Sequence, residues 1–269
     1  MRRISAILSK QNRALLSELV RTDFKLRYQG SILGYGWTLL RPLLLFVILY
    51  VVFVKFLRIG GDIPHFPIYL LFGIVLWNFF NEMTVQSTTS IVNRGDLIRK
   101  IRIPRWIIVF SSSISALINL GLNLVVVAVF MVVSDVRPLE TLPLLPLLVA
   151  EVYVFSLGCS LFLSALYVRF RDVSYIWEVA LQAGFYLTPV LYPLSRITNV
   201  TLQKLILLNP MAQMIQDARY VAITHDTLTV AKVFDGGYYM LIPFIVIVVL
   251  LVGGLLYFKK EAKSFAENI

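Results

Sequence analysis

Six apolar stretches, nearly free of charged residues, divide the chain into segments of similar length. A helix that crosses a bilayer needs about 20 mostly apolar residues, and each stretch meets that requirement. The third and sixth stretches carry no charged residue at all. The pattern predicts an all-α integral membrane protein with six transmembrane helices, at about residues 36–56, 66–91, 106–134, 141–168, 173–192 and 236–258.

The residues before the first crossing have a different pattern, in which two faces of a helix separate. Leu15, Leu19 and Phe24 recur at helical spacing on one face, and Arg13, Ser17, Arg21, Lys25 and Gln29 recur on another. This predicts a basic amphipathic helix over residues 12–29 that lies in the headgroup region of the membrane. The alternative is a surface helix that packs on its own protein.

The segment between the fifth and sixth crossings, residues 193–238, contains two short apolar helix candidates. The first covers residues 202–208. The second begins at Asn209-Pro210, where Asn caps the helix and Pro takes its first position, and it continues to residue 223. Both are too short to cross a bilayer, so we expect a re-entrant or interfacial pair over the outer mouth. The alternative is an ordinary extracellular hairpin.

A basic loop, NRGDLIRKIRIPRW at residues 93–106, separates the second crossing from the third. Asp96 is predicted to cap a short helix, because its carboxylate can accept the free N–H groups of a first turn. Leu97, Ile98 and Ile101 form a small apolar face, and Pro104 ends the turn. This loop either only sets the membrane topology or is a docking helix for a cytoplasmic partner.

Composition and charge support the membrane class and give the orientation. The 269 residues are 58% hydrophobic, the mean hydropathy is +0.80, and the net charge is +10. With six crossings, 18 of the 25 Lys and Arg residues fall on the side that holds both termini and the loops near residues 93–105 and 168–172. The positive-inside rule places this side in the cytoplasm. Because topology accounts for the basic surplus, binding of nucleic acid is disfavoured.

Polar side chains inside the crossings are candidates for a conduit. Glu82 and Gln86 belong to a polar stripe on the second crossing, Glu178 lies on the fifth, and Tyr186 belongs to an aromatic cluster near the outer mouth. Charged groups at this depth are costly and usually face a bundle interior, a cavity or a partner charge. They either line a wet substrate entrance or hold the bundle together by hydrogen bonds.

Several motifs of enzymes are missing from the sequence. There is no GxxxxGK[ST] phosphate loop, no HExxH and no DDxxD. The chain has two histidines and a single cysteine, Cys159, so a metal centre built on these residues is not expected. We therefore expect a transport protein that binds no cofactor and draws its energy from another subunit.

Four stretches resemble the membrane subunit of ABC-2 type exporters, in particular the branch that exports O-antigens, teichoic acids and capsules. They occur in the family's order on a matching six-span plan, and the resemblance covers nearly the whole chain. LRYQGSILGYGWTLLRPL resembles the start of the first span, NRGDLIRKIRIPRW the coupling helix, RFRDV the turn between the fourth and fifth spans, and LNPM the turn between two outer gate helices.

The resemblance implies one transmembrane domain over residues 1–269, comprising a cytoplasmic interfacial helix (1–35), a six-span bundle (36–258) and a cytoplasmic tail (259–269). It implies a homodimer with two copies of an ABC ATPase, which bind ATP and Mg and move a lipid-linked polysaccharide across the inner membrane of a prokaryote. The coupling helix, at about residues 94–103, would dock the ATPase through Asp96, Leu97, Ile98, Arg99, Lys100 and Ile101.

It further implies outer gate helices at about residues 201–223, with their turn at Asn209 and Pro210. At the cytoplasmic surface, Arg27, Arg41 and Arg169 are candidates to attract the lipid pyrophosphate by charge.

Two alternatives remain. One is an ABC-2 permease for another cargo, such as a drug or a lipid. The other is a membrane-embedded glycosyl- or prenyltransferase, which would need clustered acidic metal ligands. The cytoplasmic loops between the crossings offer only Asp96 and Asp172, far apart in sequence.

Overall fold

The protein is helical throughout the part that its structure describes. The computed structural model describes residues 10–27, 30–34, 36–58, 63–100 and 103–265, and no strand occurs among them. Five helical segments of this part are long and apolar enough to cross a membrane: Gly36–Phe56, Phe66–Asn93, Trp106–Val133, Leu142–Arg169 and Tyr238–Glu261. They match five of the six predicted crossings, and the chain has the all-α character of an integral membrane protein.

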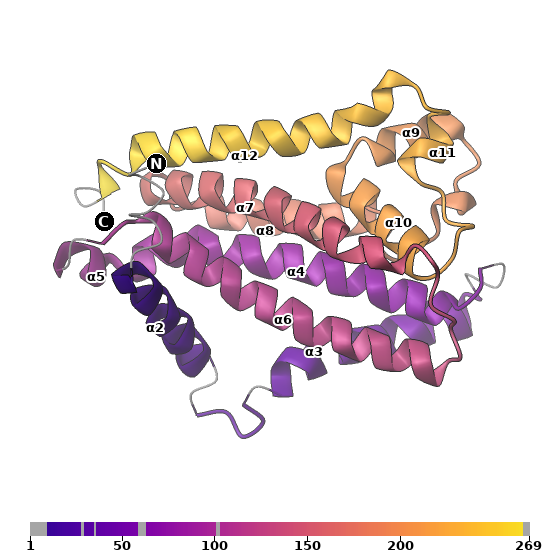
Figure 1. The fold of residues 1–269 in the computed structure, drawn as a ribbon, viewed down its shortest axis with the longest axis horizontal. Helices are drawn as coiled ribbons and strands as arrows, with labels where there is room; N and C mark the ends of the chain where they lie inside the picture. Colours follow the sequence, from indigo (N-terminus) through magenta and orange to yellow (C-terminus); the bar gives the residue numbers. More distant parts are fainter. Residues whose placement is uncertain (1–9, 28–29, 35, 59–62, 101–102, 266–269) are drawn as a thin grey trace.

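Helix α4 (Phe66–Asn93) is the centre of the bundle (Figure 1). Of its 28 residues, 19 are buried. It packs against α3 (Gly36–Leu49), α6 (Trp106–Val133), α7 (Leu145–Arg169), α8 (Val173–Leu187) and α10 (Pro210–Ala222). Its second half also buries hydroxyl groups. Thr84 and Thr88 donate hydrogen bonds to carbonyls one turn earlier, at 2.8 and 2.7 Å. These two buried hydroxyl groups are thus satisfied within the helix itself.

Three long helices surround α4. Helices α6 (Trp106–Val133) and α7 (Leu145–Arg169, after the turn η2, Leu142–Leu144) pack on it directly, and α12 (Ile242–Glu261, after η4, Tyr238–Leu241) packs along α7. The contact between α7 and α12 is close at Gly158 and Gly254. A Cβ added at Gly158 would lie 2.8 Å from the backbone nitrogen of Leu251. Small residues at a crossing let two membrane helices approach each other in this way.

Helix α3 (Gly36–Leu49), which continues as the π-helix η1 (Tyr50–Phe56), lies where the first crossing was predicted. It packs on α4 and α6, and its outer side exposes Leu44, Val47 and Ile48. Helix α2 (Lys10–Arg27) forms where the amphipathic helix was predicted, and it packs against α6. The structure therefore places α2 against its own protein, whereas its contact with the headgroup region stays a prediction.

The helix of the fifth predicted crossing is shorter than expected. Helix α8 covers Val173–Leu187, 15 residues, whereas the sequence predicted a crossing that continued to residue 192. At Thr188 the chain leaves the helix with a ψ of 140°. Pro189 explains this end, because proline lacks an N–H group and disfavours helical geometry in the residue before it. The chain continues as a buried, non-helical segment over residues 188–191, so the fifth predicted crossing, and with it the total of six, stays a prediction.

The connection from α8 to α12 contains η3 (Leu194–Arg196), α9 (Val200–Leu207), α10 (Pro210–Ala222) and α11 (Val230–Val233). Helices α9 and α10 form where two short helices were predicted. Eleven of the 13 residues of α10 are buried, and Met211, Met214, Ile215 and Ala218 join the main core. This burial differs from that of a solvent-exposed hairpin. The role of the pair as a gate stays a prediction.

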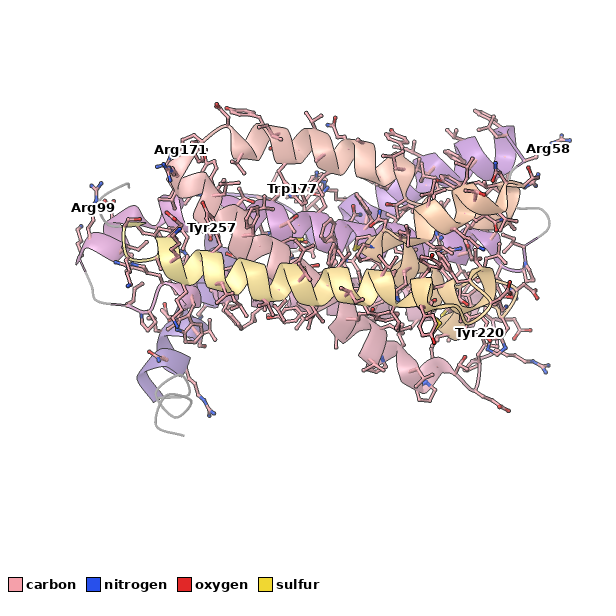
Figure 2. All side chains as sticks on the ribbon, turned by 90° about the horizontal axis from the view of Figure 1, so that it is seen from above. Arg58, Arg99, Arg171, Trp177, Tyr220 and Tyr257 are labelled. Atoms are coloured by element: carbon pink, nitrogen blue, oxygen red, sulfur yellow. The ribbon has the colours of Figure 1, made fainter. Side chains whose placement is uncertain are left out.

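The bundle has two ends of different composition, which we call the α5 end and the α10 end. The α5 end carries α5 (Gly95–Lys100), the turn between α7 and α8, and the end of α12 (Figure 1). Figure 2 places Arg99 and Arg171 there, and it places Arg58 and Tyr220 at the α10 end.

Candidate functional site

Helix α5 forms the tip of the α5 end and has the exposed charges of a docking element. It is six residues long, and Asp96, Arg99 and Lys100 are exposed. Leu97 and Ile98 are half-buried, and Ile98 packs against the hydrophobic core. Of the two, Leu97 is therefore the more available to a partner. Ile101, the third predicted apolar contact, lies outside the described residues.

The helix cap predicted at Asp96 lies two positions too late in the sequence, because a helix that begins at Gly95 has its cap position at Arg94. Helix α5 begins at Gly95, so Asp96 lies inside its first turn, and no hydrogen bond from its side chain to the backbone is found. The N–H of Ile98 bonds instead to the carbonyl of Arg94, at 3.1 Å. A carboxylate in a first turn still interacts favourably with the positive end of the helix dipole.

Arg94 ties three helices together beside α5. It is the C-cap residue of α4, and its guanidinium donates to the carboxylate of Asp23 on α2 and to Ser111 Oγ on α6, the latter at 2.8 Å. The side chains of Arg94 and Asp23 are 16% and 28% exposed, so the pair is only partly desolvated. Arg94 therefore connects the junction of α4 and α5 to both α2 and α6.

A cavity of about 200 Å³ adjoins this contact between α2, α4 and α6. Eight of its nine lining residues have polar or charged side chains, and they come from all three helices: Asp23, Phe24, Gln86, Thr89, Ser90, Asn93, Arg94, Ser112 and Ser115. The predicted conduit residue Gln86 thus lines a cavity.

Glu82 is joined to the same polar network by hydrogen bonds. Its carboxylate accepts from Gln86 Nε2 at 2.8 Å and from Asn119 Nδ2 on α6 at 2.5 Å. The polar stripe therefore links α4 to α6. The choice between a substrate entrance and a structural role for the stripe stays open. Glu82 accepts a hydrogen bond from a neighbouring helix, as a structural role requires, and Gln86 lines the cavity, as an entrance requires.

The other predicted conduit residues lie elsewhere. Helix α8 turns Trp177 toward α4, where its Nε1 donates to Thr84 at 3.0 Å, and this leaves Glu178 and Tyr186 exposed on another face. Glu178, Gln182 and Tyr186 are spaced four residues apart, so they form one stripe along α8. The structure separates this stripe from Glu82 and Gln86, because α4 contacts α8 through Thr84 and contacts α6 through Glu82.

Of the three basic residues proposed for the lipid pyrophosphate, the two whose side chains the structure describes lie on different helices. Arg41 is exposed on α3, and Arg169 is exposed at the end of α7, where its guanidinium lies 5.3 Å from the centre of the Phe170 ring. Arg27 ends α2, and its side chain lies outside the described part of the structure.

At the α10 end, Asn209 and Pro210 form the predicted helix start. Asn209 Oδ1 accepts from the N–H of Met211 at 3.0 Å, and Pro210 occupies the first position of α10. Asn209 Nδ2 also donates to Thr188 Oγ1, at 3.1 Å. The cap of α10 is thereby bonded to the residue at which α8 ends.

Arg219 on α10 is a buried connecting residue at this end that the sequence pattern did not indicate. It is 0% exposed, and its guanidinium donates to the carbonyls of Tyr69 (2.9 Å), Pro189 (2.5 Å) and Val190 (2.7 Å) and to Gln216 Oε1 (3.1 Å). It also lies 3.8 Å from the centre of the Tyr69 ring. Burial lowers the pKa of this guanidinium below its usual value. Arg219 joins α10 to the start of α4 and to the segment after α8.

An acidic side chain of α10 is also shifted by burial. Burial raises the pKa of Asp217 to about 6, although a hydrogen bond donated by Gln213 Nε2 at 2.7 Å opposes the shift. Glu151 on α7 is near enough for its carboxylate to interact with that of Asp217.

The chain was also compared with known proteins. The model of the ABC-2 type transporter family matches residues 14–223. Similar proteins include the O-antigen export system permease protein RfbA of Myxococcus xanthus, 31% identical over 260 residues that cover 96% of each chain. Two proteins of the same name from Klebsiella pneumoniae are 30% and 29% identical, each match covering 94% of both chains.

The family model covers most of the chain, and the described part has the apolar helices of a multi-pass membrane protein. The chain belongs to the ABC-2 type transporter family.

Proposed function

We propose that this chain is the membrane-spanning permease subunit of an ATP-driven exporter that moves a lipid-linked polysaccharide of the O-antigen type across the inner membrane of a prokaryote. The observation that carries the proposal is the match to permeases named for O-antigen export, which extends over 94–96% of both chains.

Coupling to ATP hydrolysis is assigned to a separate ATPase subunit, which binds ATP and Mg. The sequence has no phosphate loop of its own. Helix α5 is the proposed contact, because it presents basic side chains and the half-buried Leu97 at the tip of the α5 end. The tie from Arg94 to Asp23 would pass movement of α5 on to α2.

The proposed topology has six crossings, with the α5 end in the cytoplasm. Helix α8 begins near Arg171 at the α5 end, and the segment after it meets Arg219 at the α10 end. Its 15 residues rise about 22 Å, and the buried segment 188–191 extends further. Together they have the reach of a crossing. The proposed gate is formed by α9 and α10, which cover the opposite end.

The proposed working unit is a homodimer with two ATPase subunits. Helix α8 exposes Glu178 and Gln182 in the middle of an otherwise apolar surface. A carboxylate that faces lipid is costly, so this stripe is better explained by a partner subunit or a water-filled conduit. We assign Glu178 and Tyr186 to the glycan path between two copies of the chain.

The proposal is tested by removing the gene from its host and following the glycan. We expect loss of glycan from the cell surface, accumulation of the lipid-linked form on the cytoplasmic side, and restoration of export by the wild-type chain. Unchanged surface glycan together with no intracellular accumulation would contradict the proposal.

A further inference from the structure

The cavity between α2, α4 and α6 is lined by hydroxyl groups whose acceptor sides are available. Ser90 and Ser115 donate their protons to carbonyls of their own helices, at 2.7 and 3.0 Å, and Ser112 does so at 3.4 Å. A hydroxyl oxygen carries one proton and two lone pairs, so each of these groups retains acceptor capacity after donating. The lining thus favours a ligand that brings several O–H donors.

The charges of the lining cancel. Asp23 and Arg94 are the charged residues among those that line the cavity, and they are hydrogen-bonded to each other. A phosphate or carboxylate ligand would have to compete with Asp23 for the guanidinium. A neutral ligand leaves the pair intact, and Asn93 and Thr89, which are bonded to each other at 3.2 Å, add further polar groups at its side.

The size of the cavity sets the scale of the ligand. A volume of about 200 Å³ holds about seven water molecules at about 30 Å³ each. This is below the 300–1,000 Å³ that is typical of sites for drug-sized ligands. This volume matches one ring-sized polyol.

We propose that this cavity binds a single neutral sugar unit at the α5 end of the bundle. The inference deepens the proposed function, and it rests on that function only for the link between the bound sugar and the exported glycan. Chemistry alone allows two sources of a neutral polyol, a sugar of the glycan or the glycerol headgroup of a lipid, and we assign the site to the sugar.

The test is saturation-transfer NMR on the full-length protein in lipid nanodiscs. The sample includes the ATPase subunit where the two proteins co-purify, and no nucleotide is added. The probes are free mannose, galactose and glucose, with glucose 6-phosphate as the charged contrast. We expect transfer to at least one neutral hexose and none to glucose 6-phosphate. Nanodiscs of phosphatidylcholine alone are compared with nanodiscs that also contain phosphatidylglycerol, and the hexose signal should be the same in both.

Two variants locate the signal. Ser112→Met fills the cavity and should reduce transfer at least fivefold. Thr89→Val is nearly isosteric, removes one hydroxyl group, and should weaken hexose binding about threefold, as expected for one hydrogen bond. The matched control is Ala128→Met, which adds similar bulk to the same helix α6 beside the other, apolar cavity. It should leave the signal unchanged.

Three outcomes would overturn the inference: no hexose transfer in either nanodisc, equal transfer to glucose 6-phosphate, or a signal that both cavity variants leave intact. Loss of the hexose signal when phosphatidylglycerol is present would assign the cavity to a lipid headgroup instead of a sugar. The proposed function fails separately, through unchanged export in the gene deletion, and sugar binding by the purified chain is measured independently of that result.

Discussion

Arg94 and Arg219 lie at opposite ends of the bundle and are held in opposite ways. Arg94 is partly exposed, pairs with the carboxylate of Asp23, and adjoins a polar cavity. Arg219 is fully buried, and its hydrogen-bond partners in the described part of the chain are backbone carbonyls and the amide oxygen of Gln216. A cavity whose lining includes Ala222 of α10 is apolar, with a volume of about 410 Å³.

The contacts of Arg94 are cheaper to break than those of Arg219, so the α5 end can rearrange more easily than the α10 end. A partly exposed ion pair typically contributes about 0–1 kcal/mol, because water replaces either partner at little cost. A buried guanidinium has no such replacement, and each carbonyl that loses it costs about 1–3 kcal/mol. The contacts of the α5 end are therefore easily exchanged, and those of the α10 end are costly to break. Under the proposed function, the first would transmit movement from the ATPase and the second would keep the gate closed.

The largest effect is expected at Arg219. Arg219→Met should lower the free energy of unfolding by about 3 kcal/mol or more, because three backbone carbonyls lose their donor. The free energy of unfolding of Arg219→Lys should lie between those of the wild type and Arg219→Met, since a lysine keeps a donor but cannot reproduce the planar set of donors. Thermal unfolding in detergent, followed by tryptophan fluorescence, measures both. The control is Arg137→Met at an exposed position, and equal stability of Arg219→Met and this control would break the comparison.

The next effect is expected at Gly73 on α4. A Cβ at this position would clash with the guanidinium of Arg219 and lie 3.2 Å from the carbonyl oxygen of Val190. We expect Gly73→Ala to destabilise by about 1–3 kcal/mol, as is usual for overpacking. Gly121→Ala is the matched control in another helix, where a Cβ would meet nothing within 4 Å. It should be neutral or stabilising by up to about 1 kcal/mol. The same unfolding assay measures both variants, and equal stability of Gly73→Ala and Gly121→Ala would contradict the prediction.

A smaller effect follows from Asp217. Because its pKa in the folded protein is raised to about 6 from a usual value near 3.8, the folded state holds the proton more tightly than the unfolded state. Stability should therefore fall as pH rises from about 4 to about 6, by on the order of 1 kcal/mol, and then level off. Asp217→Asn should remove this part of the pH dependence and be more stable than the wild type at pH 7. An unchanged pH profile in the variant would contradict the assignment.

The smallest effect is expected at the α5 end. Asp23→Asn should change stability by less than about 1 kcal/mol, because its pair with Arg94 is partly exposed. A double-mutant cycle with Arg94→Met isolates the interaction, and its coupling energy should be about 0.2–1 kcal/mol. A coupling as large as the effect of Arg219→Met would remove the distinction between the two ends.

Much of the fold follows from local properties of the sequence. The apolar runs of α4, α6, α7 and α12 are long enough to predict their helices, and the Asn209-Pro210 pair fixes the start of α10 through its immediate neighbours. Helix α8 was predicted too long because apolar residues continue to Leu191. Pro189 ends the helix earlier, because it disfavours helical geometry at Thr188. Asp96 was predicted as the cap but is the second residue of α5, because Gly95 was not expected to begin the helix.

The contacts between distant residues were beyond such reasoning. Asp23 and Arg94 are 71 positions apart, and Arg219 and Tyr69 are 150 apart, so no periodicity connects them. An arginine in a short helix next to a polar loop is usually exposed. The sequence holds no clear signal for Arg219, because three of its four hydrogen-bond partners are backbone carbonyl groups, which every residue possesses.

The central claim, that the chain exports a glycan with energy delivered through α5, is tested most directly in inside-out membrane vesicles. These would contain the chain, its ATPase partner and the lipid-linked glycan. The account predicts that ATP makes the glycan inaccessible to an added glycosidase, and that Leu97→Asp abolishes this protection while the protein remains folded. Protection without ATP, or full protection in the Leu97→Asp variant, would contradict it.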